Sequence, residues 1–216
     1  MSTKSPVFVV LMLMLLSGCA VHGPVTERVA QDVWQQHQVS LLALTDWGFD
    51  GRVVIGDGRT STKMALHWQQ QQEQFDIRLM SFFGQQQARF QGVNGGPVTL
   101  LRPGQPPLQA AGAMLLMQQE LGWALPLAGL RYWVVGVPVP GRPADWGVDS
   151  LGRLEWLEQD GWRVEFARYQ MVAGMAMPRK IRLYHESLRA RLVLDSWQLE
   201  LSPAHDGVVV SPLEAG

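Results

Sequence analysis

The chain has 216 residues and a mass of 24.1 kDa, which suits one domain with a sizeable core. Its formal net charge of −1 gives no electrostatic reason to expect nucleic-acid binding. Charged residues make up only 17% of the chain, whereas nine Trp and ten Met are present. This composition fits either a large apolar core or a cavity for varied apolar ligands, because Met and aromatic side chains adapt to irregular surfaces.

The first residues have the layout of an export signal. Lys4 precedes an apolar run at 6–16 that is too short to span a bilayer comfortably. The sequence LSGC at 16–19 resembles the bacterial lipoprotein box, and Cys19 is the single cysteine of the chain. That resemblance implies cleavage before Cys19 and lipid attachment to its thiol and its new amino group. The alternative is an ordinary signal peptide followed by a coincidental cysteine.

Residue 20 indicates which membrane would hold such an anchor. It is Ala20, not the Asp that resembles an inner-membrane retention signal in enteric bacteria. The sequence therefore predicts a protein held by lipid at the periplasmic face of the bacterial outer membrane, where several acyl chains anchor firmly at about 0.8 kcal/mol per buried CH₂. The expected boundaries are a signal peptide at 1–18, a lipidated tether at 19–26, a single domain at 27–201 and a tail without visible pattern at 202–216.

The mature chain opens with a helical pattern and continues with strands. From Glu27 to Leu44, apolar residues that include Val29, Val33, Trp34 and Leu41 recur near helical spacing. Alternation of apolar and polar residues then predicts a series of strands bounded by Gly, Asn or Pro turn signals. These strands are expected at 51–57, 61–70, 74–80, 87–93 and 97–102.

Helix signals interrupt the strands before the sheet resumes. The segment 108–122 is helix-prone with Gly122 as its stop, and a second short helix begins in 125–143 before a loop rich in Gly and Pro. Asp160-Gly161 then predicts a two-residue hairpin turn. The hairpin and the two closing strands are expected within 153–170, 180–186 and 189–199.

Together these elements predict a mainly β protein with some α structure. Many antiparallel strands with one apolar face favour a curved sheet or open antiparallel β-barrel, with the helices covering its concave side. The helices look too few to fill a barrel with side chains. The pattern therefore favours an apolar cavity beneath them.

No catalytic or metal-binding constellation stands out in the sequence. Nucleophile-elbow, zinc-protease, phosphate-loop and dinucleotide motifs are absent, and the five histidines are scattered without metal-ligand spacing. His67 and His185 fall on predicted polar strand faces, and Asp145 and Asp149 lie in a Pro/Gly-rich loop, so we interpret all four as solvated. We assign no catalytic residue, metal or cofactor, and we expect no enzyme.

From about Trp34 to Leu199 the chain resembles the LolB family of outer-membrane lipoprotein receptors. The most specific motif is L-P-x-x-x-L-x-x-W-x-x-G-x-P at 125–138, whereas isolated Gly-Arg or Gly-Trp pairs are weak. The further matching segments are Trp47, GR at 51–52, LHWQQ at 66–70, FFG at 82–84, LGWALPLAGLRYWVVGVPVP at 121–140, LEQDGWRVEF at 157–166, MPRKIRL at 177–183 and RLVLDSWQL at 191–199.

The resemblance implies a receptor, expected here to be monomeric, that takes acylated lipoproteins from the periplasmic carrier LolA and places them in the outer membrane. It also implies an open barrel lidded by helices, with a hydrophobic cavity for the acyl chains. The side chains that we expect to face this cavity are Met64, Leu66, Trp68, Ile77, Leu79, Trp133, Val164, Phe166, Leu183, Leu192 and Leu194.

Phe82, Phe83 and Gly84 form a second expected site. Two adjacent Phe residues at a bend are unusual, because turns favour Gly, Asn, Asp, Ser and Pro. In the family, an apolar residue in a protruding loop between two strands is implicated in driving cargo into the membrane. That position falls on Phe83, while Phe82 stands where relatives often carry Pro. A ring folded back onto the barrel rim is the alternative.

Three other functions stay open at this point. A periplasmic sensor or regulator could bind lipid or lipoprotein on the same barrel, and such a protein should contain a second domain. An envelope hydrolase would need a nucleophile with a base nearby. A purely structural outer-membrane lipoprotein would need no open apolar pocket.

Overall fold

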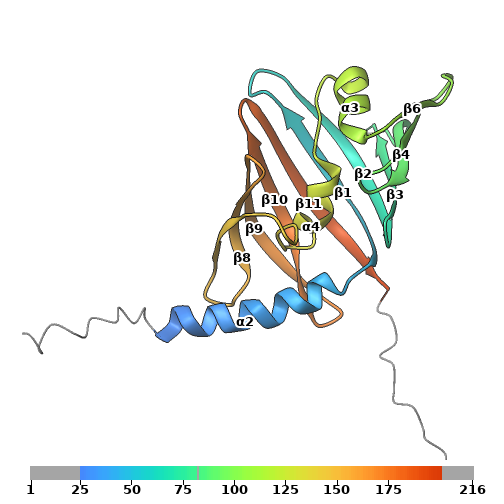
Figure 1. Cartoon of the computed structure of the whole chain (residues 1–216). Coiled ribbons are helices and arrows are strands. Elements are labelled where there is room, and N and C mark those ends of the chain that lie inside the picture. The colour runs from blue at the N-terminus through green and yellow to red at the C-terminus, as the bar shows by residue number, and fades with distance from the viewer. Residues whose placement is uncertain (1–24, 82, 201–216) are drawn as a thin grey trace, which may run out of the picture.

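A computed structural model describes residues 25–81 and 83–200, which form one curved antiparallel sheet of eleven strands together with three helices (Figure 1). The strand order is β6-β5-β4-β3-β2-β1-β11-β10-β9-β8-β7. Neighbours in the chain are therefore neighbours in the sheet, except that β1 pairs with β11 and β6 and β7 lie at the two edges. This architecture confirms the predicted mainly β fold with an open, curved antiparallel sheet.

The elements follow one another along the chain with short connections. The helices are α2 (Val25–Leu42), α3 (Ala113–Leu121) and α4 (Leu127–Trp133). The strands are β1 (Asp46–Gly56), β2 (Ser61–Gln71), β3 (Gln74–Met80), β4 (Gln86–Val93), β5 (Val98–Leu101), β6 (Leu108–Ala110), β7 (Asp145–Val148), β8 (Leu154–Gln159), β9 (Trp162–Val172), β10 (Met175–His185) and β11 (Leu188–Leu199).

Two segments differ from the sequence-based expectation. The predicted helix at 108–122 begins only at Ala113, because Leu108–Ala110 adds an edge strand to β5, with Val98 opposite Ala110. The loop after α4 contains the short strand β7, whose four residues pair with β8. Each of these strands pairs with the strand next to it in the chain, and at three and four residues they are too short to show a pattern of their own.

The concave side of the sheet carries the core of the molecule. Inward-facing residues of the strands and the buried faces of α3 and α4 form one continuous apolar cluster. At the end of the sheet where β1 begins and β11 ends, Trp47, Phe49, Trp68 and Trp197 pack ring against ring, with centroids 5.4 Å apart for Trp47–Trp68 and 5.1 Å for Phe49–Trp197. Such aromatic contacts stabilise the pairing of β2, β1 and β11 beyond the area they bury.

Helix α2 lies across one end of the sheet and packs on the turn between β7 and β8 (Figure 1). Trp34 and Leu41 are buried, whereas Val29 and Val33 remain exposed. Gly152 sits under the helix with φ +67°, and a Cβ at this position would lie 2.7 Å from the carbonyl oxygen of Ala30. Glycine is therefore favoured at this position for two reasons. It adopts the left-handed backbone conformation without strain, and it has no side chain to keep the helix at a distance.

Asp149 organises the same turn. Its Oδ1 accepts hydrogen bonds from the backbone amides of Leu151 and Arg153, each 3.0 Å long, and its Oδ2 accepts from the Arg153 guanidinium at 2.6 and 2.8 Å. Burial by itself would raise the pKa of this carboxyl, but the hydrogen bonds outweigh it and hold the pKa below its usual range. The prediction of a solvated Asp149 is therefore wrong, while Asp145 is exposed as expected.

Asp149→Asn should destabilise the protein near neutral pH. The pKa of Asp149 in the folded protein lies below that of an Asp in the unfolded chain, which is about 3.9. The contribution of its ionised carboxylate to stability is therefore fully present above about pH 3.9, and it is lost as the pH falls through the pKa of the folded state. We expect the free energy of unfolding to fall by about 1–2 kcal/mol at pH 7. Urea unfolding at pH 7 and at pH 3 would measure this, with Asp145→Asn as the matched control. An equal difference at both pH values would contradict the assignment.

Candidate functional site

The structure brings the eleven predicted interior side chains together on the concave side of the sheet. All of them belong to the same apolar cluster, and their exposed fractions lie between 0% for Trp133 and 9% for Met64. They come from β2, β3, α4, β9, β10 and β11, which are spread over more than a hundred residues of the chain. In this structure they are covered by side chains, so they form a closed apolar interior.

Helix α4 and the segment after it cover the middle of this interior. Leu127, Leu130 and Trp133 of α4 are buried, and so are Val134, Val135 and Val137. The specific motif at 125–138 thus supplies the apolar face of a cover. Pro126 precedes the helix, and Gly136 turns the chain with φ +91°.

One buried amide attaches this cover to the sheet. Gln159, at the end of β8, is only 3% exposed, and its Oε1 accepts hydrogen bonds from the indole nitrogen of Trp133 at 3.0 Å and from the backbone amide of Val139 at 2.8 Å. Its Nε2 donates to the carbonyl of Val139 at 3.1 Å. Trp133, predicted as a cavity residue, is therefore also the hydrogen-bonded anchor of α4.

Sequence reasoning missed Gln159. Period-two alternation from Leu157 places it on the inner face of β8, where a polar side chain needs a partner. A polar residue at an inward position next to the Asp160-Gly161 turn was the available signal. Its partners could not be found from the sequence because they lie 20 and 26 residues away.

The Phe83 loop lies between β3 and β4 and is held in a defined shape. The amide of Ser81 donates to the carbonyl of Gln85 at 2.8 Å, and the amide of Gly84 donates to the carbonyl of Ser81 at 3.0 Å. Gly84 has φ +77°, a conformation that favours glycine. These bonds leave the Phe83 ring 91% exposed, the highest value among the exposed large apolar side chains of the described residues.

An exposed ring at the tip of a braced turn differs from the alternative of a ring folded onto the rim. Leaving a Phe side chain in water instead of burying it costs about 1.5–3 kcal/mol. Phe82 lies outside the described residues, so the structure places only Phe83 and Gly84 of the predicted loop. Cys19, the predicted lipid attachment site, also lies outside them.

His67 and His185, both predicted to be solvated, have structural partners. His67 Nδ1 lies 2.7 Å from a carboxylate oxygen of Asp50, and the ring of His185 stacks on Trp162 with centroids 4.8 Å apart. The side chain of His67 is mostly covered, so its predicted solvation is wrong. Over residues 25–81 and 83–200 no group of three His, Cys, Asp or Glu side chains could hold a metal ion. Within the same ranges no helix combines the length and the apolar character needed to cross a membrane.

The chain is similar in sequence to a known family of bacterial proteins. The family model described as Outer membrane lipoprotein LolB matches residues 45–197. The outer-membrane lipoprotein LolB of Nitrosococcus oceani is 38% identical over 193 residues, covering 88% of this chain and 96% of that protein. The LolB of Pseudomonas paraeruginosa is 38% identical over 189 residues, covering 86% and 92%.

Solved structures share the fold at low sequence identity. A LolA superfamily protein from Nitrosomonas europaea superposes with a TM-score of 0.52 at 9% identity, covering 81% of this chain and 94% of that one. A DUF1329 family protein from Desulfovibrio piger gives a TM-score of 0.54 at 8% identity, covering 83% and 96%. The fold, the family match and the identity over nearly the full length of the relatives agree. The chain belongs to the LolB family of outer-membrane lipoproteins.

Proposed function

We propose that this protein is the outer-membrane receptor that accepts acylated lipoproteins from the periplasmic carrier LolA and inserts them into the outer membrane. Membership of the LolB family supports this function. The single observation that carries it is the pairing of a closed apolar interior with one fully exposed Phe on a braced loop. The interior suits acyl chains, and the exposed ring suits contact with a bilayer.

Cargo binding would take place in the interior lined by the eleven residues. Since these side chains are buried, an acyl chain enters only when part of the cover moves. Each CH₂ that enters contributes about 0.8 kcal/mol, so a long acyl chain offsets the apolar contacts that the cover loses. Apolar packing does not read the protein part of the cargo, which fits a receptor for many lipoproteins.

The hand-off requires no chemical step by this protein. Transfer runs downhill when the interior binds acyl chains more tightly than the carrier does, and when the bilayer holds them more tightly still. We propose that a lipid anchor on Cys19 keeps the receptor at the periplasmic face of the outer membrane, with the domain acting as a monomer. All the buried apolar side chains lie between Ala30 and Leu194, so removal of residues 1–19 leaves the whole described core in place.

Cargo transfer tests the function directly. A version lacking residues 1–19 is mixed with a LolA-bound lipoprotein and then recovered by pull-down. We expect the lipoprotein to move to this protein without ATP. Cargo that stays on the carrier would contradict the receptor function.

Phe83→Glu should separate the two halves of the function. Acceptance of cargo from LolA should be unchanged, whereas release into liposomes should fall by at least tenfold, because a charged side chain loses the 1.5–3 kcal/mol available from burying the ring. Met171→Glu is the matched control. Met171 is also exposed, but it lies near the β9–β10 turn at the opposite end of the strands. Normal release by the Phe83 variant would overturn the role of the loop.

Photo-crosslinking locates the acyl chains. A photoreactive residue in place of Leu192 or Ile77 should crosslink to the acyl part of bound cargo, because both side chains face the concave interior. The matched control replaces Val54, which lies on β1 but points to the opposite face of the sheet. Crosslinks at Val54 with none at the interior positions would contradict the proposed site.

Gln159→Leu should loosen the cover. It leaves the indole nitrogen of Trp133 and the amide of Val139 without their acceptor, at about 1–3 kcal/mol for each buried donor. We expect faster hydrogen exchange in residues 127–140 and a lower free energy of unfolding. Gln87→Leu, on the exposed start of β4, is the control. Unchanged exchange in the cover would show that Gln159 does not hold it.

A further inference from the structure

The outer face of the sheet has a concentration of positive charge. Two neighbouring hollows of about 370 and 630 Å³ open there and share Val54 and Arg191 in their walls. Strands β1, β2, β9, β10 and β11 and the β1–β2 turn line them. The cationic residues of the two walls are Arg52, Arg59, Lys63, Arg168, Arg179, Lys180, Arg182, Arg189 and Arg191.

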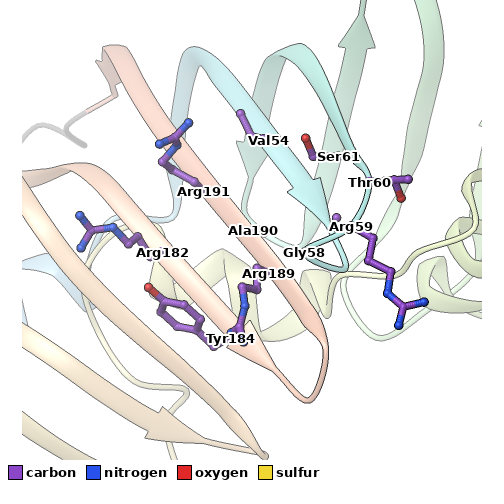
Figure 2. A pocket seen from close by; sticks show the side chains of 11 residues that line it. Val54, Gly58, Arg59, Thr60, Ser61, Arg182, Tyr184, Arg189, Ala190 and Arg191 are labelled. Atoms are coloured by element: carbon purple, nitrogen blue, oxygen red, sulfur yellow. The ribbon is translucent and has the colours of Figure 1, made fainter.

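Nine of the 18 Lys and Arg residues of a chain with net charge −1 thus gather on one face, which we call the basic face. Figure 2 shows Arg182, Arg189 and Arg191 on β10 and β11, with Arg59 on the nearby turn. Asp195 is the one acidic side chain that lines either hollow, and it is paired with Arg52 at 2.9 Å. Most of the positive charge on this face is therefore not neutralised locally.

Pairing elsewhere on the outer face shows the contrast. Asp76 holds both Arg78 and Arg89. On the basic face itself, Arg52 is paired with Asp195, and Arg182 lies 3.5 Å from Glu165. Among the described residues, seven cations of the basic face have no salt bridge. They are Arg59, Lys63, Arg168, Arg179, Lys180, Arg189 and Arg191.

Strand register makes this arrangement unfavourable for the folded protein alone. Arg182 is directly opposite Arg191 on the neighbouring strand, and Lys180 is paired with Arg168 where the register of β9 and β10 shifts. Like charges in cross-strand positions destabilise a sheet. An arrangement that costs stability is explained by a function in binding negative charge.

The basic face adjoins the Phe83 loop. Ala65 lines the larger hollow and pairs with Met80, and the loop begins at the next residue, Ser81. Lys63 lies two residues closer to the same end of β2. The apolar Phe83 suits the acyl region of a membrane, and the neighbouring cations suit the phosphate headgroups that lie above that region.

We propose that the basic face docks on the anionic lipid headgroups of the membrane beside the point where Phe83 enters it. The cations bind headgroup phosphates and orient the sheet so that the loop meets the bilayer. This inference concerns how the domain sits on the membrane, and it does not depend on cargo binding in the interior. Its failure can therefore be distinguished from failure of the proposed receptor function.

Vesicle binding by the version lacking residues 1–19 tests the proposal, since the lipid anchor would mask any weaker attachment. The vesicles contain phosphatidylcholine with or without phosphatidylglycerol. We expect tighter binding to the anionic vesicles, and this preference should fall as salt rises. Each cation near an anionic surface strengthens binding about fivefold. Lys63→Gln combined with Arg191→Gln should therefore weaken binding to anionic vesicles about 25-fold and leave binding to neutral vesicles unchanged.

Arg102→Gln combined with Arg142→Gln is the matched control. This variant also loses two positive charges, but from positions outside the basic face. If binding depends on where the charges lie and not on the net charge of the protein, it should change binding to anionic vesicles by less than about twofold. Lys63, Arg142 and Arg191 are exposed and Arg102 is half-buried, so the circular dichroism spectra of both double variants are compared with that of the unaltered protein before binding is measured.

Three results would overturn the proposal. The first is equal binding of the unaltered protein to both kinds of vesicle, and the second is an equal loss in the two double variants. The third is full anionic binding by the Lys63 and Arg191 variant together with weaker acceptance of cargo from LolA. That last result would assign the basic face to a protein partner instead of a lipid surface.

Discussion

A single curved sheet with one apolar face has to bury that face, and the rest of this structure depends on how it does so. Pairing of β1 with β11 joins the first and last strands at the centre of the sheet, so the chain folds into one continuous concave surface. Helices α3 and α4 and the segment after α4 supply apolar side chains to that surface. A cover made of separate short elements, unlike another sheet, can move without breaking strand pairing.

The attachment of this cover combines many weak apolar contacts with a few directional ones. Trp133 fills the interior and also donates a hydrogen bond to Gln159, which in turn holds Val139. The buried amide of Gln159 has all these hydrogen-bond partners only when the cover is closed. Because hydrogen bonds depend on direction, they fix the position of the cover more closely than apolar packing does. An acyl chain can replace apolar contacts between cover and sheet, but it cannot replace these hydrogen bonds. In the proposed cycle, these hydrogen bonds give the closed state a specific geometry to which the cover would return after cargo leaves.

The two faces of the sheet differ in chemical character because side chains alternate along each strand. On β11, Leu192 and Leu194 point into the interior while Arg191 lies on the outer face. Burial restricts the inner positions to apolar residues, whereas the outer positions are free of that requirement and can carry charge. The same strands can therefore hold an acyl chain on one side and interact with a membrane surface on the other. Phe83 lies at the end of the sheet where β2 begins, next to the basic face.

The sequence by itself determined the strands, the turn residues and the identity of the inner face, because period-two alternation and signals such as Asp160-Gly161 are local. The ten predicted interior residues that lie on strands are buried for that reason, whereas Trp133 is buried as part of helix α4. The edge strands β6 and β7 and the hydrogen bonds around Asp149 involve nearby residues, but strands of three and four residues and a single tight turn show no periodic pattern in the sequence. The partners of Gln159 were decided by the tertiary structure, since they lie 20 and 26 residues away in the chain. The basic face is of the same kind. Lys63, Lys180 and Arg191 are unremarkable in separate strands, and only the order of the strands in the sheet brings their charges together.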